Sequence, residues 1–410
     1  MPENQKHDDI YGHAGHPQDP QRRVLLDMLA AGGLATLLGK RAAAANPADG
    51  VVRIGYLPIT DAAALLVAYA NGYFAEQGLE AERPTLIRSW PALVEAFASH
   101  TFNVVHLLKP IPIWMRYNNN FPVKVAAWCH TNGSAVVVGG HTNIKSFADC
   151  GGGQIAVPFW YSMHNVVLQM ALREAGLKPV IKNQGEAVAA DEVNLQVLPP
   201  PEMPAAMAAR KIDGYIVAEP FNALGEIKAG GRVLRFTGDI WKNHPCCALV
   251  MHEEDLAERR AWSQKVVNAV VKGALYASAN KSETARMISR DGESFLPVPA
   301  QVVERAMTYY NNEEYTTSQA VRNAKDWGNG RIDFNPYPYP SATKFLVEQM
   351  RQTVGGSDNE FITNLEPQTV AQDLVDYELV TNALQDNDSW LADPSVDATS
   401  PWQRQEVFKL

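Results

Sequence analysis

Short runs of β-branched residues alternate with longer amphipathic segments from residue 51 onward, and this alternation most constrains the fold. The runs are bounded by Gly, Pro or Asn, and strands are expected at Val51–Tyr56, Asn103–Leu107, Lys124–Trp128, Ala135–Val138, Gln154–Pro158, Asn194–Leu198, Gly214–Val217, Arg232–Phe236 and Ala248–Met251. Strands that alternate with helical segments are typical of α/β proteins with largely parallel sheets.

Helix limits are marked by capping residues between these strands. Thr60-Asp61 is expected to cap a helix that runs to about Gln77, Ser89 one over 91–99, and Ser162 one over 164–175. Helical spacing also covers 259–286 and 302–310. After about residue 355 we expect one helix near 370–384 and then a loosely ordered acidic tail, within a C-terminal extension over 351–410.

Residues 1–45 differ from the rest of the chain. They combine a polar start, the pair Arg22-Arg23, a weakly apolar run from Met28 to Leu38, and an alanine-rich end at Ala45. This order of features is typical of a twin-arginine export signal and predicts a periplasmic protein. An ordinary N-terminal amphipathic helix is the alternative.

Composition excludes several classes. The 410 residues suffice for two domains, and no apolar run approaches the roughly 20 residues of a membrane span. The net charge of −9, with no long basic block, provides no nucleic-acid footprint. Removing 1–45 leaves this charge unchanged, because the segment holds as many acids as bases. Four cysteines exclude a disulfide-built scaffold.

An ordered set of motifs over about 51–350 resembles the nitrate- and bicarbonate-binding proteins of bacterial ABC importers, within the nitrate/sulfonate/taurine group. The motifs are Ile54–Ala63, Asn71–Phe74, Gln77–Leu79, Ser89-Trp90, Val105–Pro112, Thr131–Gly133, Ser162–Asn165, Val197–Met203, Asp213–Phe221, Ile240-Trp241 and His244-Pro245. The resemblance implies a type II periplasmic-binding-protein fold, with two α/β lobes around a central cleft.

We expect lobe 1 over 51–138 plus 246–350 and lobe 2 over 139–245, joined by strand-like crossovers at 135–139 and 247–251. The implied function is that of a periplasmic receptor, expected to be a monomer, which delivers a small-molecule solute to an inner-membrane permease and its ATPase. In open α/β sheets ligands bind beyond the carboxyl ends of the strands, which is where several motifs fall.

The resemblance implies ligand-binding roles for Trp90, Asn132, Ser134, His164 and Glu219. Core packing is the alternative for Trp90, and a capped or solvated histidine for His164. Glu219, just before Pro220, has three interpretations: it binds a cation, pairs across the hinge, or caps a turn. Asp61 is interpreted first as a helix cap and second as a ligand contact.

One departure from the family pattern concerns the ligand. This chain has Cys246-Cys247 after His244-Pro245, where the family has an acidic and a basic residue, and Ser134 replaces a longer amide. The pocket is therefore expected to lack a cation, which weakens the inference to nitrate. A neutral amide or a guanidinium-like cation, stacked on Trp90, Trp160 or Tyr161, is the alternative ligand.

The cysteines leave further alternatives open. Cys246-Cys247 has no second Cys pair at zinc-ligand spacing, so we interpret it as two buried thiols rather than a metal or redox pair. Cys129 and Cys150 would be able to form a bridge in an oxidising compartment. We expect no cofactor, although a metal ion associated with the ligand, for example on Glu219, remains an alternative.

An enzyme of the same fold, which makes a thiamine pyrimidine precursor, is an alternative of another class. Its Cys-rich iron motif and its Schiff-base lysine have no match here. No catalytic Ser/His/Asp spacing or phosphate loop is present, so we expect no enzymatic activity.

Overall fold

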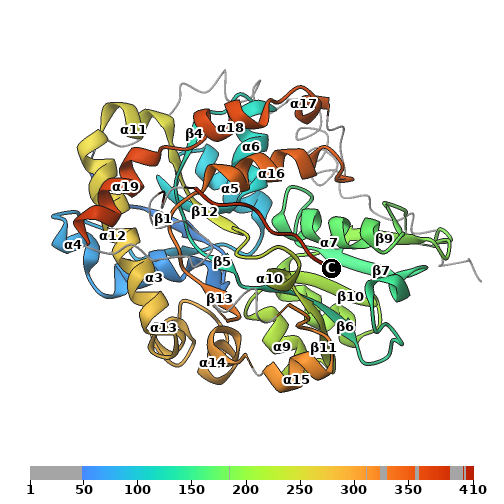
Figure 1. Cartoon of the computed structure of the whole chain (residues 1–410). Helices are drawn as coiled ribbons and strands as arrows, with labels where there is room; N and C mark the ends of the chain where they lie inside the picture. The colour runs from blue at the N-terminus through green and yellow to red at the C-terminus, as the bar shows by residue number, and fades with distance from the viewer. Residues whose placement is uncertain are drawn as a thin grey trace, which may run out of the picture. The chain divides into compact units, whose positions relative to one another are not determined.

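The computed structural model describes residues 49–183, 185–310, 312–323, 330–355, 360–387, 400 and 403–410 (Figure 1). The export signal predicted over 1–45 lies outside the described residues. Within them, no helix is both long enough and apolar enough to cross a membrane.

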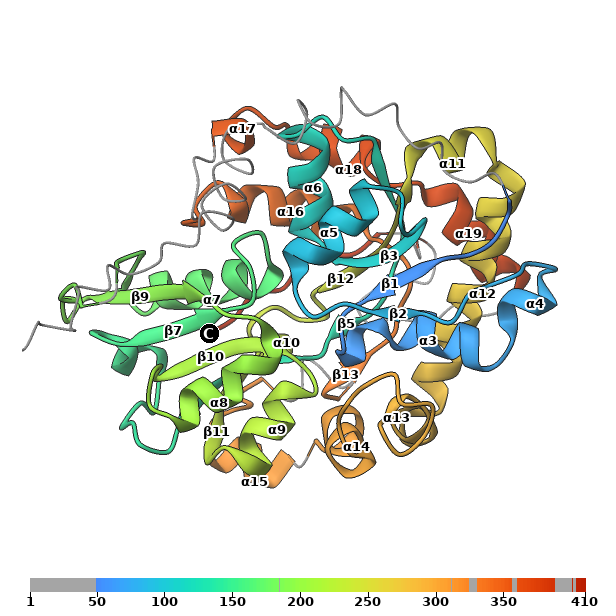
Figure 2. The same cartoon turned by 180° about the vertical axis from the view of Figure 1, so that it is seen from behind.

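A five-stranded sheet forms the first half of the fold. Its order is β2-β1-β3-β12-β4, with β1 at Ile54–Tyr56, β2 at Thr85–Leu86, β3 at Val104–Leu108, β4 at Val123–Trp128 and β12 at Cys247–His252. β1, β2 and β3 are parallel, whereas β12 runs antiparallel to both of its neighbours. Helices α5 (Trp90–Ala98) and α6 (Pro110–Tyr117) cover one face, and α3 (Ala63–Ala70) and α12 (Arg260–Ala279) the other (Figures 1 and 2).

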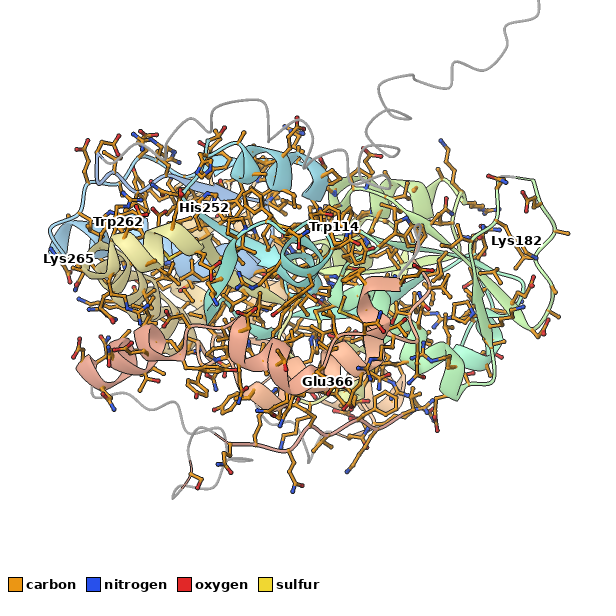
Figure 3. The ribbon with its side chains drawn as sticks, turned by 90° about the horizontal axis from the view of Figure 1, so that it is seen from above. Trp114, Lys182, His252, Trp262, Lys265 and Glu366 are labelled. Carbon is orange, nitrogen blue, oxygen red and sulfur yellow. The ribbon has the colours of Figure 1, made fainter. Side chains whose placement is uncertain are left out.

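A six-stranded sheet forms the second half. Its order is β11-β6-β10-β7-β9-β8, with β6 at Ser134–Gly139, β7 at Gln154–Val157, β8 at Lys178–Val180, β9 at Glu192–Val197, β10 at Gly214–Ala218 and β11 at Gly231–Phe236. Helix α7 (Met163–Glu174) lies on one face, and α8 (Met203–Ala208) and α9 (Phe221–Lys228) lie on the other (Figure 2). Figure 3 shows Lys182, between β8 and β9, far from Trp262 on α12.

Two described segments connect strands of one sheet with strands of the other. Residues 129–133 lead from β4 to β6, and residues 241–246 lead from α10 (Thr237–Ile240) to β12. Both expected crossovers are wrong: 135–139 lies in β6, which pairs with β10 and β11 of the six-stranded sheet, and 247–251 lies in β12, which pairs with β3 and β4 of the five-stranded sheet. The lobe boundaries over 51–138, 139–245 and 246–350 stay a prediction.

All nine strands expected from the sequence are present. Four short segments were not expected: β2, β5 (Thr131–Asn132), β8 and β13 (Ile332–Asp333). They are two or three residues long, which is too short to show a period of two. The two-stranded β5–β13 ladder joins the first crossover to Ile332 and Asp333.

The expected helix over 60–77 is divided in the structure. It consists of a 3-10 turn, η1 (Thr60–Ala62), then α3, then α4 (Tyr73–Glu76), with Gly72 at φ +73° between them. A residue in the left-handed conformation interrupts a helix. The helical spacing of the apolar residues continues across this interruption, so the sequence pattern did not reveal it. The remaining helices are α11 (Glu253–Glu258), α13 (Lys281–Ile288), α14 (Ala300–Thr308), α15 (Asn312–Thr317), α16 (Pro340–Met350), α17 (Glu360–Thr363), α18 (Pro367–Asp373) and α19 (Tyr377–Asp386), with 3-10 turns η2 (Phe147–Cys150) and η3 (Pro200–Glu202).

The prediction of a loosely ordered tail is wrong for the described C-terminal residues. Two helices, α18 and α19, replace the single expected helix and pack against α16 and α12. Phe408 forms a β-bridge with Trp241, whose indole Nε1 donates to Glu406 at 2.7 Å. The acidic composition of this segment suggested a solvated tail. The buried residues of α19 are apolar, and they pack against α12.

Candidate functional site

The carboxyl edge of the five-stranded sheet gathers polar side chains from four segments. Asp61 follows β1, His106 lies in β3, His130 follows β4, and Cys247 begins β12. Because β12 runs antiparallel to its neighbours, its first residues lie at the same edge, with Cys247 opposite Leu108. All four polar side chains are fully buried.

Asp61 and His130 form a buried pair. The Asp61 Oδ2 to His130 Nε2 distance is 2.7 Å, and both side chains are fully buried. Burial by itself would lower the pKa of His130, but the Asp61 carboxylate and Cys246 together outweigh it and raise that pKa to about 10. Burial raises the pKa of Asp61, against the effect of His130. The pair therefore sets a histidine whose pKa is raised beside a carboxyl whose pKa burial raises and His130 lowers.

The helix-cap interpretation of Asp61 is wrong. Asp61 lies inside η1, whose first residue follows Ile59, and neither η1 nor α3 has a side-chain cap. The Ser89 hydroxyl likewise forms no cap bond on α5. Ser162 is the confirmed cap, because its hydroxyl accepts the Asn165 N–H at 3.0 Å and begins α7.

Ser134, His164 and Cys246 form a second polar group, which contacts the first. Ser134 begins β6, and its hydroxyl lies 2.9 Å from His164 Nε2 on α7. That nitrogen also lies 3.8 Å from the Cys246 sulfur. Burial alone would raise the pKa of Cys246, but the Cys247 thiol and the nearby histidines hold it well below its usual range. The pKa of Cys247 is raised by burial and by Cys246.

Trp90 and Asn132 are buried beside these groups. The Trp90 ring packs against His106 at a centroid distance of 5.6 Å, so its packing role and its position at the site coincide. Asn132 adopts φ +59°, and its amide donates to Asn243 at 3.4 Å. At the next residue, Gly133, a Cβ would lie 2.8 Å from Ile332 and 3.0 Å from His130 Nδ1. The Asn-Gly pair therefore allows His130 to approach the crossover closely.

Glu219 forms a buried ion pair, as one of the three sequence interpretations allowed. It follows β10, and its Oε1 accepts from Arg331 Nε at 2.6 Å, with both side chains fully buried. Its Oε2 accepts the Ala223 N–H at 3.1 Å, so it also satisfies a backbone donor at the start of α9. Burial raises the pKa of Glu219, and Arg331 opposes this shift. Arg331 is also held by Glu226 at 3.0 Å.

These pairs correct the expectation of a site that has acids but no cation. Asp61 faces His130 and Glu219 faces Arg331, so each buried carboxylate has its own cation. Both carboxylate oxygens of Glu219 have a protein partner in the structure, and a metal ion on Glu219 stays an alternative. His130 directly precedes the Thr131–Gly133 motif and was within reach of the motif comparison, whereas nothing in the sequence around Arg331 indicated a role.

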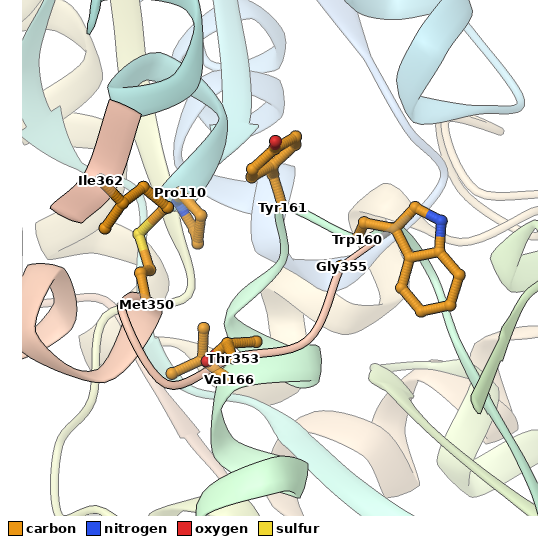
Figure 4. Close-up of a pocket in the computed structure, with 8 residues that line it drawn as sticks. All are labelled: Pro110, Trp160, Tyr161, Val166, Met350, Thr353, Gly355 and Ile362. Carbon is orange, nitrogen blue, oxygen red and sulfur yellow. The ribbon is translucent and has the colours of Figure 1, made fainter. Parts of the chain in front are cut away.

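Trp160 and Tyr161 face a different pocket. They line it together with Pro110, Val166, Met350, Thr353, Gly355 and Ile362, none of which belongs to the polar groups described above (Figure 4). Tyr161 stacks on Trp114 at 5.3 Å. The expectation that these two rings stack on a solute of the polar cluster receives no support from this geometry. The four cysteines are free and buried, Cys129 and Cys150 included.

Several buried polar atoms of the site have no hydrogen-bond partner. They are Trp90 Nε1, His106 Nδ1, His130 Nδ1, His164 Nδ1, Asp61 Oδ1 and Asn132 Oδ1. His106 Nε2 accepts the Leu57 N–H at 2.8 Å, and burial lowers the pKa of His106 to about 3. The neutral ring therefore carries its proton on Nδ1, which is a free donor. Native proteins leave few buried polar atoms unpaired, so this concentration indicates a place for a polar ligand.

We call the place where these two polar groups meet, between the two sheets, the junction. The two sheets and this junction define a protein of the periplasmic-binding-protein fold, and comparison with solved structures agrees. The nitrate-binding protein NrtA from Synechocystis PCC 6803 superposes with a TM-score of 0.68 at 21% identity, covering 88% of this chain and 94% of that protein.

The chain belongs to the NMT1-like family, whose model matches residues 45–289. The nitrate/nitrite-binding protein NrtA of Nostoc sp. is 28% identical over 322 residues, which are 73% of this chain and 70% of that protein. The nitrate import ATP-binding protein NrtC of Synechocystis sp. is 26% identical over 244 residues, and the match spans 54% of this chain but only 34% of NrtC. The resemblance to the nitrate- and bicarbonate-binding group is thereby confirmed.

Proposed function

We propose that the protein is a periplasmic solute-binding protein of an ABC importer, and that it captures a small planar anion of the nitrate or bicarbonate type at the junction of its two sheets. Family membership and the names of its relatives support the class. The charge state of the junction supports the kind of solute.

The single observation that carries the choice of an anion is the pairing of both buried acids. Asp61 and Glu219 each already have a cationic partner, so a guanidinium-like solute would find no uncompensated carboxylate. The indole Nε1 of Trp90 and the Nδ1 of His106 are unpartnered donors. Buried donors without a partner bind an acceptor-rich anion better than they bind a cation.

Solute entry requires the two sheets to separate. Trp90, Ser134 and His164 are at most 2% exposed, although Trp90 lies on α5 beside the five-stranded sheet, and Ser134 and His164 lie in β6 and α7 of the other half. Two-lobed binding proteins open and close by a hinge, and the crossovers at 129–133 and 241–246 are the segments that would carry it. The closed form would deliver its solute to a permease and an ATPase, and no reaction would follow capture. Residues 1–45 would direct export by the twin-arginine route.

Thermal unfolding of the purified protein tests the proposal. Nitrate, nitrite, bicarbonate and cyanate are compared with guanidinium and urea at equal millimolar concentrations, with chloride as the ionic-strength control. A solute that binds only the native state raises the melting temperature, by an increment that grows with its concentration over Kd. At least one planar anion is expected to stabilise the protein. Stabilisation by guanidinium or urea alone would contradict the anion assignment.

Two tryptophans provide matched variants for this experiment. Trp90 and Trp128 are both buried, and the Nε1 of each lacks a partner. The Trp128 ring contacts Tyr339 and the cations Lys109 and Arg404 rather than His106. Trp90→Phe, which removes only the donor side of the ring system, is expected to reduce the solute-dependent shift, and Trp128→Phe to preserve it. Equal shifts in both variants would refute the site.

A further inference from the structure

Four side chains at the base of the two crossovers form a set of metal-binding donors. They are Asp61, His130, Cys246 and Cys247, and one donor atom from each lies within 4.8 Å of all the others. All four are fully buried. The sequence analysis interpreted Cys246-Cys247 as two buried thiols, because no further ligands stand at zinc-ligand spacing in the sequence. The fold brings the other two donors, Asp61 and His130, from distant segments of the chain.

We propose that these four residues bind a thiophilic divalent metal ion of the zinc type. Two sulfurs, one imidazole and one carboxylate are the ligand types that zinc accepts, and thiolates disfavour calcium and magnesium. The inference does not depend on solute capture, because the donors are all protein atoms.

The spacing is compatible with tetrahedral coordination after small shifts. Bonds of about 2.0 Å to nitrogen or oxygen and about 2.3 Å to sulfur place the donors of a tetrahedron roughly 3.3 to 3.8 Å apart. The Cys247 sulfur lies 3.3 Å from Asp61 Oδ2, which is within that range. The His130 to Asp61 contact of 2.7 Å must widen, and the longest donor separation must shorten by about 1 Å.

Independent support comes from donor atoms that lack partners. Asp61 Oδ1 and His130 Nδ1 are both buried and unpartnered. Because neither of these two atoms holds a hydrogen bond, both side chains are able to turn toward a metal ion without breaking a hydrogen bond at Oδ1 or Nδ1.

The position of the site gives the metal a structural consequence. His130 belongs to the first crossover, 129–133, and Cys246 ends the second crossover, 241–246, while Cys247 begins β12 of the five-stranded sheet and Asp61 lies in η1, after β1. A metal ion would therefore fasten both crossovers to one sheet at the point where the two sheets must pivot. We expect bound metal to stiffen the hinge and to raise the melting temperature.

Cobalt and zinc binding to the reduced full-length protein test the site in solute-free buffer. Co²⁺ bound by thiolates gives a near-ultraviolet charge-transfer band and the visible bands of a tetrahedral ion. His7, His13 and His16 near the N-terminus offer a competing imidazole site, which cannot produce the thiolate band. One equivalent of Co²⁺ is expected to produce the band, and Zn²⁺ to abolish it by displacement. Absence of the band in the reduced protein would overturn the proposal.

Single substitutions distinguish the proposed ligands from their neighbours. Cys246→Ser and Cys247→Ser are each expected to weaken Zn²⁺ binding by at least about tenfold and to reduce the cobalt band. Cys129→Ser is the matched control, because Cys129 is also a buried free thiol close enough for Asp61 to affect its pKa. Far-ultraviolet circular dichroism checks that each variant is folded. Loss of the band in Cys129→Ser, or its retention when both ligand cysteines are replaced, would refute the ligand set. Because no solute is present, either outcome leaves the proposed function untouched.

Discussion

The buried pair Glu219–Arg331 allows a quantitative test of what holds the junction together. Replacing Arg331 by Met removes the cation and leaves the Glu219 carboxylate with only the Ala223 N–H at 3.1 Å. Replacing Glu219 by Gln is milder, because Arg331 keeps Glu226 at 3.0 Å and Tyr315 at 3.1 Å.

The two variants should therefore differ in stability. Breaking a buried pair by removing one partner costs about 3 to 5 kcal/mol, and this range is expected for Arg331→Met. Glu219→Gln retains an acceptor of the same shape, so its cost is expected near 1 to 3 kcal/mol, the range for a perturbed buried hydrogen bond. In the double variant both charges are gone, and its loss should fall short of the sum by about 0.5 to 3 kcal/mol.

Urea unfolding of the wild type and the three variants, followed by circular dichroism, measures these values. The loss in Arg331→Met should also grow as pH rises above about 4.3, because the orphaned Glu219 carboxyl prefers its proton in the folded state. Equal losses in the two single variants, or additive losses in the double variant, would refute the claim that the Arg331 charge is what makes buried Glu219 tolerable.

Two further predictions concern the ionisable groups Lys109 and Asp373. Burial lowers the pKa of Lys109 to about 7 from an ordinary 10.5. Between these two pH values the unfolded chain binds more protons than the folded protein, so the free energy of unfolding should rise with pH. Urea unfolding at pH 7, 8 and 9 should show this slope, by at most about 1.4 kcal/mol per pH unit, in the wild type relative to Lys109→Met, and identical slopes would contradict it. Hydrogen bonding to Arg116 at 2.6 Å lowers the pKa of Asp373, so the contribution of Asp373 is present above about 3.9 and is lost as pH falls further. Hydrogen exchange, corrected for intrinsic rates, should therefore show α18 opening faster at pH 3 than at pH 5 in the wild type but equally in Asp373→Asn; an unchanged wild-type rate would refute this.

Local signals were enough for the elements with strong period or clear caps. The β-branched strands and the Ser162 cap of α7 were predicted because neighbouring residues decide them. The break at Gly72 was missed because apolar spacing continued through it. The short ladder between β5 and β13 was also missed, because it joins residues 200 positions apart in the chain, with Asn132 opposite Ile332.

The candidate site was predictable only in part, since motifs name residues but not their partners. The motifs brought Trp90, Ser134, His164 and Glu219 forward, and the structure places the first three at one junction. The cation for Glu219 comes from Arg331, 112 positions later, with no local mark. Trp160 and Tyr161 illustrate the opposite error, because their position next to Ser162 in the sequence did not place them in the same pocket as His164.

The sequence by itself determined the α/β class, the family and most strand positions, because each depends on a pattern that neighbouring residues carry. Only the tertiary structure decided the charge state of the junction. It set His130 against Asp61, and it set Cys246 and Cys247 beside them, by running β12 antiparallel so that its first residues meet the carboxyl ends of β1, β3 and β4. Electrostatic and coordination partners depend on distance in space, and spacing along the chain does not encode that distance.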